Sequence, residues 1–202
     1  MFITRTRFLI AAVAAAALTV AGCSDDSTTA TETTTSAAAT TSASTRTDFN
    51  EADVTFLQMM YPHHAQAVDM AKMVPSRTQN PQLLALAAAV EAAQAPEMQQ
   101  ITTLLESFGK PAPSSDEHGG HGGHAMPGMM TPEQMTALEN ATGPEFDRQW
   151  MEMMIEHHVG AIDMANTVLA EGVNPDTKAL ATSIVAAQQA EIDQMKQMLG
   201  QS

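Results

Sequence analysis

Two pairs of adjacent histidines, His63-His64 and His157-His158, are the residues of this sequence best suited to chemistry. Imidazole binds transition metals and exchanges protons near neutral pH. Methionines lie beside both pairs, and 15 of the 16 methionines fall between residues 59 and 198. A thioether together with an imidazole suits copper(I) better than iron, manganese, calcium or magnesium. The candidate metal ligands around the two pairs are Met59, Met60, His63, His64, Met70, Met153, Met154, His157, His158 and Met164.

A third group of histidines and methionines occupies residues 109–130. Glycine and proline exclude a stable helix there, so we expect a mobile loop. A tract of this composition is typical of metal capture, and a plain low-complexity linker is the alternative interpretation. Its candidate ligands are His118, His121, His124, Met126, Met129 and Met130.

The histidine pairs belong to an internal repeat with an offset of 94 residues. Residues 56–71 align without a gap on residues 150–165, and Asn80-Pro81 falls on Asn174-Pro175. The folded part is therefore predicted to contain two copies of one unit, residues 48–108 and 131–200, joined by the loop.

Each copy is predicted to form two helices, since alanine, methionine, glutamine, glutamate and leucine dominate. Asp48 with Glu51, and Thr142 with Glu145, have the spacing of capping boxes at the first helix of each copy. Each Asn-Pro step supplies an N-cap followed by proline at the first helical position. Thr131-Pro132 predicts a short extra helix. We expect an all-α protein, an antiparallel four-helix bundle built from two repeated helical hairpins.

Heptad spacing places polar residues on the stripes that such a bundle buries. Buried polar groups are costly unless they find partners, so they should meet one another or a ligand. A structural hydrogen-bond network and a metal site in the bundle core are both compatible with this pattern. One histidine of each pair should face the core and the other a flank or solvent, because adjacent helical residues point about 100° apart. The polar candidates are Asp53, Gln94, Glu97, Asp147, Gln188 and Glu191.

The N-terminus carries an export signal. Arg5 and Arg7 precede an apolar run too short to span a bilayer, and the run ends in small residues before Cys23, the only cysteine. Val20-Ala21-Gly22-Cys23 resembles the lipobox of bacterial lipoproteins, which implies that residues 1–22 are removed and that Cys23 receives a lipid. The alternative is an ordinary cleaved signal peptide with an incidental cysteine. We expect residues 23–47 to form a disordered Ser/Thr/Ala tether to the bundle at 48–202. The protein would then sit on the outer face of the cytoplasmic membrane.

The mature chain would be strongly acidic. Removing two of the nine Lys and Arg residues leaves seven against 23 acidic residues, a net charge of −16. This charge argues against nucleic acid as a partner, because nucleic-acid binding depends on neutralising phosphates. It also indicates that the lipid alone provides the membrane contact.

These motifs resemble the bacterial domain of unknown function 305. The resemblance rests on Met-Met-x-Pro-His-His-x-x-Ala-x-Asp-Met-Ala at 59–71, its echo at 153–165, and Gln-x-x-Glu in each second helix. It covers about residues 48–200 and implies a ferritin-like four-helix bundle outside the cytoplasm, with some members linked to copper binding and tolerance. It also implies that Asp69 and Asp163 belong to the functional motif.

Three functions remain open at this stage. Copper capture, buffering or transfer to a partner protein follows from the His/Met chemistry. A di-iron or di-manganese oxidoreductase would use Asp53, Asp147, Glu97 and Glu191, although Met60 and Met154 replace the carboxylate of the usual Glu-x-x-His pattern. The third possibility is a structural or partner-binding bundle with a polar core. The sequence shows no Ser/His/Asp set, phosphate loop or CxxC motif and does not indicate an oligomeric state.

Overall fold

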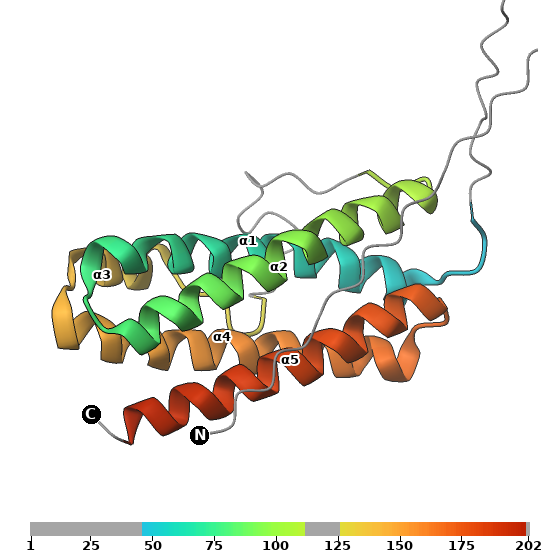
Figure 1. The fold of residues 1–202 in the computed structure, drawn as a ribbon. Helices are drawn as coiled ribbons and strands as arrows, with labels where there is room; N and C mark the ends of the chain where they lie inside the picture. The colour runs from blue at the N-terminus through green and yellow to red at the C-terminus, as the bar shows by residue number, and fades with distance from the viewer. Residues whose placement is uncertain (1–45, 112–125, 201–202) are drawn as a thin grey trace, which may run out of the picture. The chain divides into compact units, whose positions relative to one another are not determined.

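A computed structural model describes residues 46–111 and 126–200 (Figure 1). In these ranges the chain is all-helical, as predicted, with helices α1 (Glu51–Arg77), α2 (Pro81–Ser107), α3 (Pro132–Asn140), α4 (Gly143–Glu171) and α5 (Pro175–Leu199). None of the described helices is long and apolar enough to cross a membrane. The signal sequence, Cys23 and the tract containing His118, His121 and His124 lie outside the described residues.

Most of the predicted helix starts are confirmed. Asn80 and Asn174 cap α2 and α5 ahead of a proline in the first turn, and Thr131 forms a capping box with Gln134 at α3. The capping box of α1 lies two residues later than predicted, between Asn50 and Asp53. Asp48 is instead engaged by Arg46 through two hydrogen bonds of 2.8 and 2.6 Å.

The second predicted capping box is also wrong. Thr142 occupies the N-cap position of α4, but its side chain makes no capping hydrogen bond. Gly143 follows it with a φ of 60°, a left-handed conformation that glycine adopts without strain.

Helices α1 and α2 form one hairpin and α4 and α5 form the other, and the hairpins meet chiefly through α1 and α4. The predicted apolar stripes are buried along all four helices. They make two separate core clusters, one at each end of the bundle. The first cluster includes Met70, Leu83, Trp150 and Met195, and the second includes Leu57, Leu105, Ala165 and Ile184.

A polar layer between two apolar clusters

The midpoint of the bundle, between the two apolar clusters, is polar. All four histidines of the two pairs have no exposed surface, and Gln94 and Gln188 are only 2% exposed. Glu97 and Glu191, one helical turn beyond the glutamines, are 16% and 15% exposed. We call these residues the polar layer: His63, His64, Gln94, Glu97, His157, His158, Gln188 and Glu191.

The centre of the polar layer is a contact between His63 of α1 and His157 of α4. Their ring centroids are 3.7 Å apart, with an angle of 37° between the ring planes. His63 Nε2 lies 3.0 Å from the carbonyl oxygen of Pro127, to which it donates a hydrogen bond when that nitrogen carries the proton. Burial, with a smaller contribution from the neighbouring His64, lowers the pKa of His63 to about 3. Burial likewise lowers the pKa of His157 well below its usual range, so both rings are neutral at physiological pH.

The other histidine of each pair contacts a carboxylate on the adjacent helix. His64 Nε2 lies 2.7 Å from Glu97 Oε2, and His158 Nε2 lies 2.7 Å from Glu191 Oε2. A carboxylate only accepts hydrogen bonds, so each imidazole donates from Nε2. When the ring is neutral, this leaves Nδ1 with a lone pair.

The expectation that one histidine of each pair faces a flank or solvent is wrong. Helix α1 packs against both α2 and α4, and α4 packs against both α5 and α1. Two side chains about 100° apart on such a helix can therefore each meet a different neighbour inside the bundle. His63 and His157 meet each other, whereas His64 and His158 face α2 and α5.

The polar layer is short of hydrogen-bond partners. Nine of its buried nitrogen and oxygen atoms have none among the residues that the structure describes. Such atoms are rare in folded proteins, and each costs about 1–3 kcal/mol when it stays unpaired. A purely structural network is expected to satisfy its members, so this layer needs a ligand or water. The atoms are Nδ1 of His63, His64, His157 and His158, Nε2 of His157, and both amide atoms of Gln94 and Gln188.

Methionines border the polar layer on both sides. Met60 and Met154 have no exposed surface and precede His64 and His158 by four residues, which puts each thioether on the same helix face as its histidine. Met59 and Met153 are half-buried. Met70 and Met164 are buried farther along the helices, within the apolar clusters.

The end of the predicted loop is docked on the bundle. Residues 126–130 form a turn against the bundle, with Met130 only 4% exposed and Met126 and Met129 half-buried. The Gln66 side chain donates to the Met130 carbonyl oxygen at 2.9 Å and accepts from the Met130 amide at 2.7 Å. This docking, together with the Pro127 carbonyl at His63, covers part of the polar layer.

Four of the predicted polar candidates lie outside the layer. Asp69 and Asp163 are exposed. Asp53 lies at the start of α1, about 15 Å from His63 along the helix, where it accepts from the backbone N–H groups of Val173 and Asn174. Asp147 is at the other end of the bundle and accepts from the Asn80 amide at 3.0 Å. Of the four carboxylates considered for a di-metal centre, Glu97 and Glu191 contact histidines, whereas Asp53 and Asp147 lie at the two ends of the bundle.

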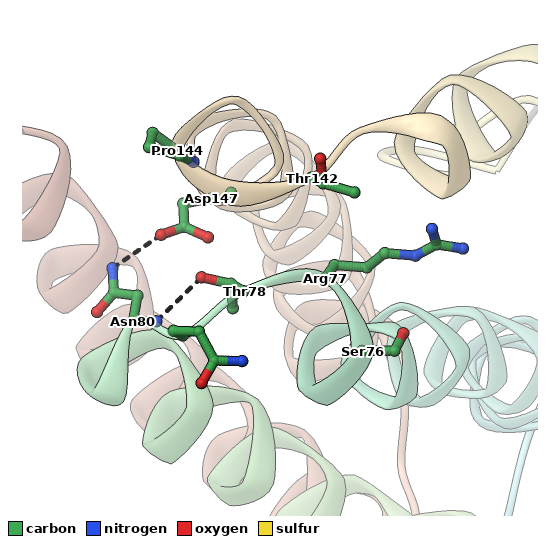
Figure 2. Close-up of a pocket in the computed structure, with 9 residues that line it drawn as sticks. Ser76, Arg77, Thr78, Asn80, Thr142, Pro144 and Asp147 are labelled. Atoms are coloured by element: carbon green, nitrogen blue, oxygen red, sulfur yellow. Dashed lines mark hydrogen bonds between the residues drawn. The ribbon is translucent and has the colours of Figure 1, made fainter.

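The two ends of the bundle differ, and one repeat position there differs between the copies. Thr78 stands where the second copy has Gly172, and a Cβ on Gly172 would lie 2.5 Å from Asp53 Oδ1. Figure 2 shows the Thr78 end, where the Asn80 amide bridges to Asp147. A cavity of about 460 Å³ opens there between the α1–α2 connection and the start of α4. It contains none of the histidines, so it is not the site described here.

Within the described ranges, no group of three or more His, Cys, Asp and Glu side chains is arranged to hold a metal ion. Any ion in the polar layer would therefore need ligands of another type, and the methionines are the adjacent ones.

Sequence reasoning missed Gln66 and Gly160, against which the turn packs, and Pro127, whose carbonyl oxygen contacts His63. One signal was present: Gln66 aligns on Gly160 in the repeat, so the two copies differ beside their histidines.

Residues 53–199 match the profile of the family described as Domain of unknown function (DUF305). The chain is similar to the crystal structure of a DUF305 protein from Streptomyces coelicolor, with 31% identity, a TM-score of 0.67, and coverage of 74% of this chain and 93% of the other. A DUF305 fragment from Deinococcus radiodurans is 32% identical, with a TM-score of 0.67 and coverage of 77% and 100%.

A third similar structure is CopM in its Cu(II)-bound form. It is 35% identical, with a TM-score of 0.62 and coverage of 72% of this chain and 94% of the other. CopM structures in Cu(I)-bound and silver-bound forms match as well. No curated protein sequence matches this chain.

Proposed function

This chain belongs to the DUF305 family, and from that premise we propose that it binds copper, most favourably copper(I), in the polar layer of its bundle. The observation that carries the proposal is the set of nine buried atoms that have no hydrogen-bond partner within residues 46–111 and 126–200, five of which are imidazole nitrogens. The similar protein CopM has been solved with Cu(II), Cu(I) and silver, which supports the same chemistry here.

We assign the leading ligand roles to His64 and His158. A metal-bound histidine usually donates its other ring N–H to a carboxylate or carbonyl, which orients the ring and raises its basicity. Glu97 and Glu191 supply that contact, so Nδ1 of each histidine is the ligand atom. Met60 and Met154 are the nearest thioethers by helical spacing, and soft sulfur ligands favour copper(I).

The cellular role that follows is copper capture or buffering outside the cytoplasm, which would confer tolerance. The lipid on Cys23 would hold the protein at the membrane, and this lipid is its only proposed membrane contact. His118, His121 and His124 would form a weaker collecting tract, because ordering a glycine-rich segment costs entropy. A copper donor or acceptor protein is the partner we propose. Nucleic acid is not one.

The two alternatives have less support. A di-metal oxidoreductase requires several oxygen ligands at the histidines. Glu97 and Glu191 lie there, but each is hydrogen-bonded to an imidazole, and Asp53 and Asp147 are bound at the ends of the bundle. A purely structural polar core would be expected to satisfy its own hydrogen bonds.

Titration of the purified full-length chain with copper(I) against a competing chelator tests the proposal. The matched variant lacks residues 114–125, which removes the histidine tract and keeps the docked turn at 126–130. We expect tight binding in both proteins. Binding that disappears with the deletion would move the principal site into the tract, and a lack of binding in both proteins would refute copper binding.

A further inference from the structure

We propose that residues 126–130 form a seal over the polar layer, and that Gln66 and Gly160 are the positioning residues that hold the seal in place. The seal controls access of the copper ion to the histidines of the polar layer. This part of the inference rests on the proposed function, whereas the closed position of the seal can be tested without metal.

Gln66 fixes one end of the seal. Its side-chain amide makes two hydrogen bonds with the backbone of Met130, at 2.7 and 2.9 Å, and the contact is buried. A glutamine used in this way substitutes for a backbone strand partner, because it satisfies the N–H and the C=O of one residue together. Met130 is then held with its side chain in the apolar cluster that also contains Met154.

Gly160 makes room for the other end. A Cβ on Gly160 would lie 2.1 Å from the Pro127 carbonyl oxygen, a distance that no side chain tolerates. Gly128 meets α4 in the same way, because its Cβ would lie 2.7 Å from the carbonyl oxygen of Glu156 and its φ is 75°. The turn therefore rests directly on the backbone of α4, which requires glycine at both positions.

The two residues that contact the turn are related by the internal repeat. Gln66 and Gly160 occupy equivalent positions 94 residues apart, on the two helices that carry the histidines. One copy has a long side chain that binds the turn, and the other has no side chain, so that the turn can approach. The turn occurs once, whereas the helices of the bundle are repeated. The two copies therefore differ at the position that contacts the turn, which is Gln66 in one copy and Gly160 in the other.

The seal also acts on the histidines. Pro127 accepts the hydrogen bond from His63 Nε2, which fixes the tautomer and leaves the lone pair on Nδ1. All four histidines have no exposed surface, so an ion reaches them only when part of the structure moves. The remaining walls are helices of 25 to 29 residues, whereas the seal is a short turn whose opening breaks few contacts.

Two variants open the seal by different means. Gln66→Leu removes both hydrogen bonds and keeps the side-chain volume, and Gly160→Ala prevents the close approach of Pro127. The matched controls are Gln100→Leu, at an exposed helical glutamine, and Val159→Ala, beside Gly160 on the exposed face of α4. Circular dichroism establishes that each variant is folded, and Gln66→Leu decides the test if Gly160→Ala does not fold.

The first readout is modification of the metal-free protein by diethyl pyrocarbonate, with His63 and His157 followed by mass spectrometry. We expect both opening variants to raise the modification rate of these histidines about tenfold or more. Each variant loses contacts that stabilise the closed position of residues 126–130, so the open form is populated more often. Rates equal to those of the controls would overturn the seal.

The second readout is the rate of copper(I) transfer from a chelator. We expect faster transfer in the opening variants with an unchanged final stoichiometry. Unchanged transfer with faster modification would refute the role of the seal in copper access. An absence of copper binding in every protein would refute both that role and the proposed function, and the modification rates would still decide whether residues 126–130 close the layer.

Discussion

Replacing His157 with leucine tests the buried, neutral state of the central histidine pair. Burial lowers the pKa of both His63 and His157 in the folded chain, to about 3 for His63. Unfolding returns each ring to water and to a pKa near 6.5. Below that pH the unfolded chain therefore takes up protons that the folded chain does not, and the free energy of unfolding falls as the pH falls.

The size of the effect follows from linkage. A histidine that stays neutral in the folded protein removes about 2 kcal/mol from the free energy of unfolding between pH 7 and pH 5. The pair together removes about 4 kcal/mol, a large part of the roughly 5–15 kcal/mol that holds a typical domain folded. His157→Leu should abolish its own half of this loss. At neutral pH the substitution should be neutral or stabilising, because neither nitrogen of His157 has a hydrogen-bond partner among the described residues.

The assay is urea denaturation of the metal-free protein at the two pH values, followed by circular dichroism. The loss of unfolding free energy between pH 7 and pH 5 is compared between variant and wild type. The carboxylates contribute equally to both losses, so their contribution cancels in the comparison. Met154→Leu is the matched control, since it changes a buried, non-titrating side chain on the same helix and should keep the full acid dependence. Equal losses of stability in wild type and His157→Leu would refute the buried, neutral His157.

Three further outcomes are expected. Glu97→Gln and Glu191→Gln should each weaken copper(I) binding about 10–100-fold in a chelator competition titration, because the carboxylate orients the ligand imidazole; affinities equal to wild type would remove these glutamates from the site. Gly172→Ala should lower the free energy of unfolding by about 1–3 kcal/mol in urea denaturation, because the new Cβ would lie 2.5 Å from Asp53 Oδ1; an unchanged midpoint would contradict the tight contact at this end. Asp53→Asn should cost about 1–3 kcal/mol in the same assay by weakening the hydrogen bonds from Val173 and Asn174, with no change in copper affinity; a loss of copper binding in folded protein would instead support a ligand role for Asp53.

The fold was predictable because its signals are local or repeated. Asn80-Pro81 and Asn174-Pro175 fix two helix starts by themselves, and the repeat requires both hairpins to fold alike. The heptad stripes identified the buried positions because one helical face must leave water. The α1 start was misplaced because Asp48 pairs with Arg46, a contact that capping rules do not include.

The partners of the histidines were harder to predict. Glu97 and Gln94 were predicted to be buried and to meet another polar group or a ligand, but the stripe did not identify His64 as the partner of Glu97. The rotation of each helix about its axis is set by all its neighbours together, and α1 has neighbours on two sides. The heptad pattern of a single helix does not determine this rotation, so it does not identify which histidine meets which carboxylate.

The docked turn could not be predicted from composition. Glycine and proline in residues 109–130 indicated irregular backbone, which is correct, but they do not distinguish a free loop from one held by long-range contacts. Those contacts come from Gln66 and Gly160, far away in the sequence.

X-ray absorption at the copper edge is the most direct test of the bundle site, applied to the copper(I)-loaded variant that lacks residues 114–125. Our account predicts that nitrogen ligands from imidazole and sulfur ligands from thioether occur together, and that the nitrogen signal falls when His64 and His158 are replaced by leucine. A spectrum with no sulfur ligand, or one unchanged by these replacements, would contradict copper binding by the polar layer.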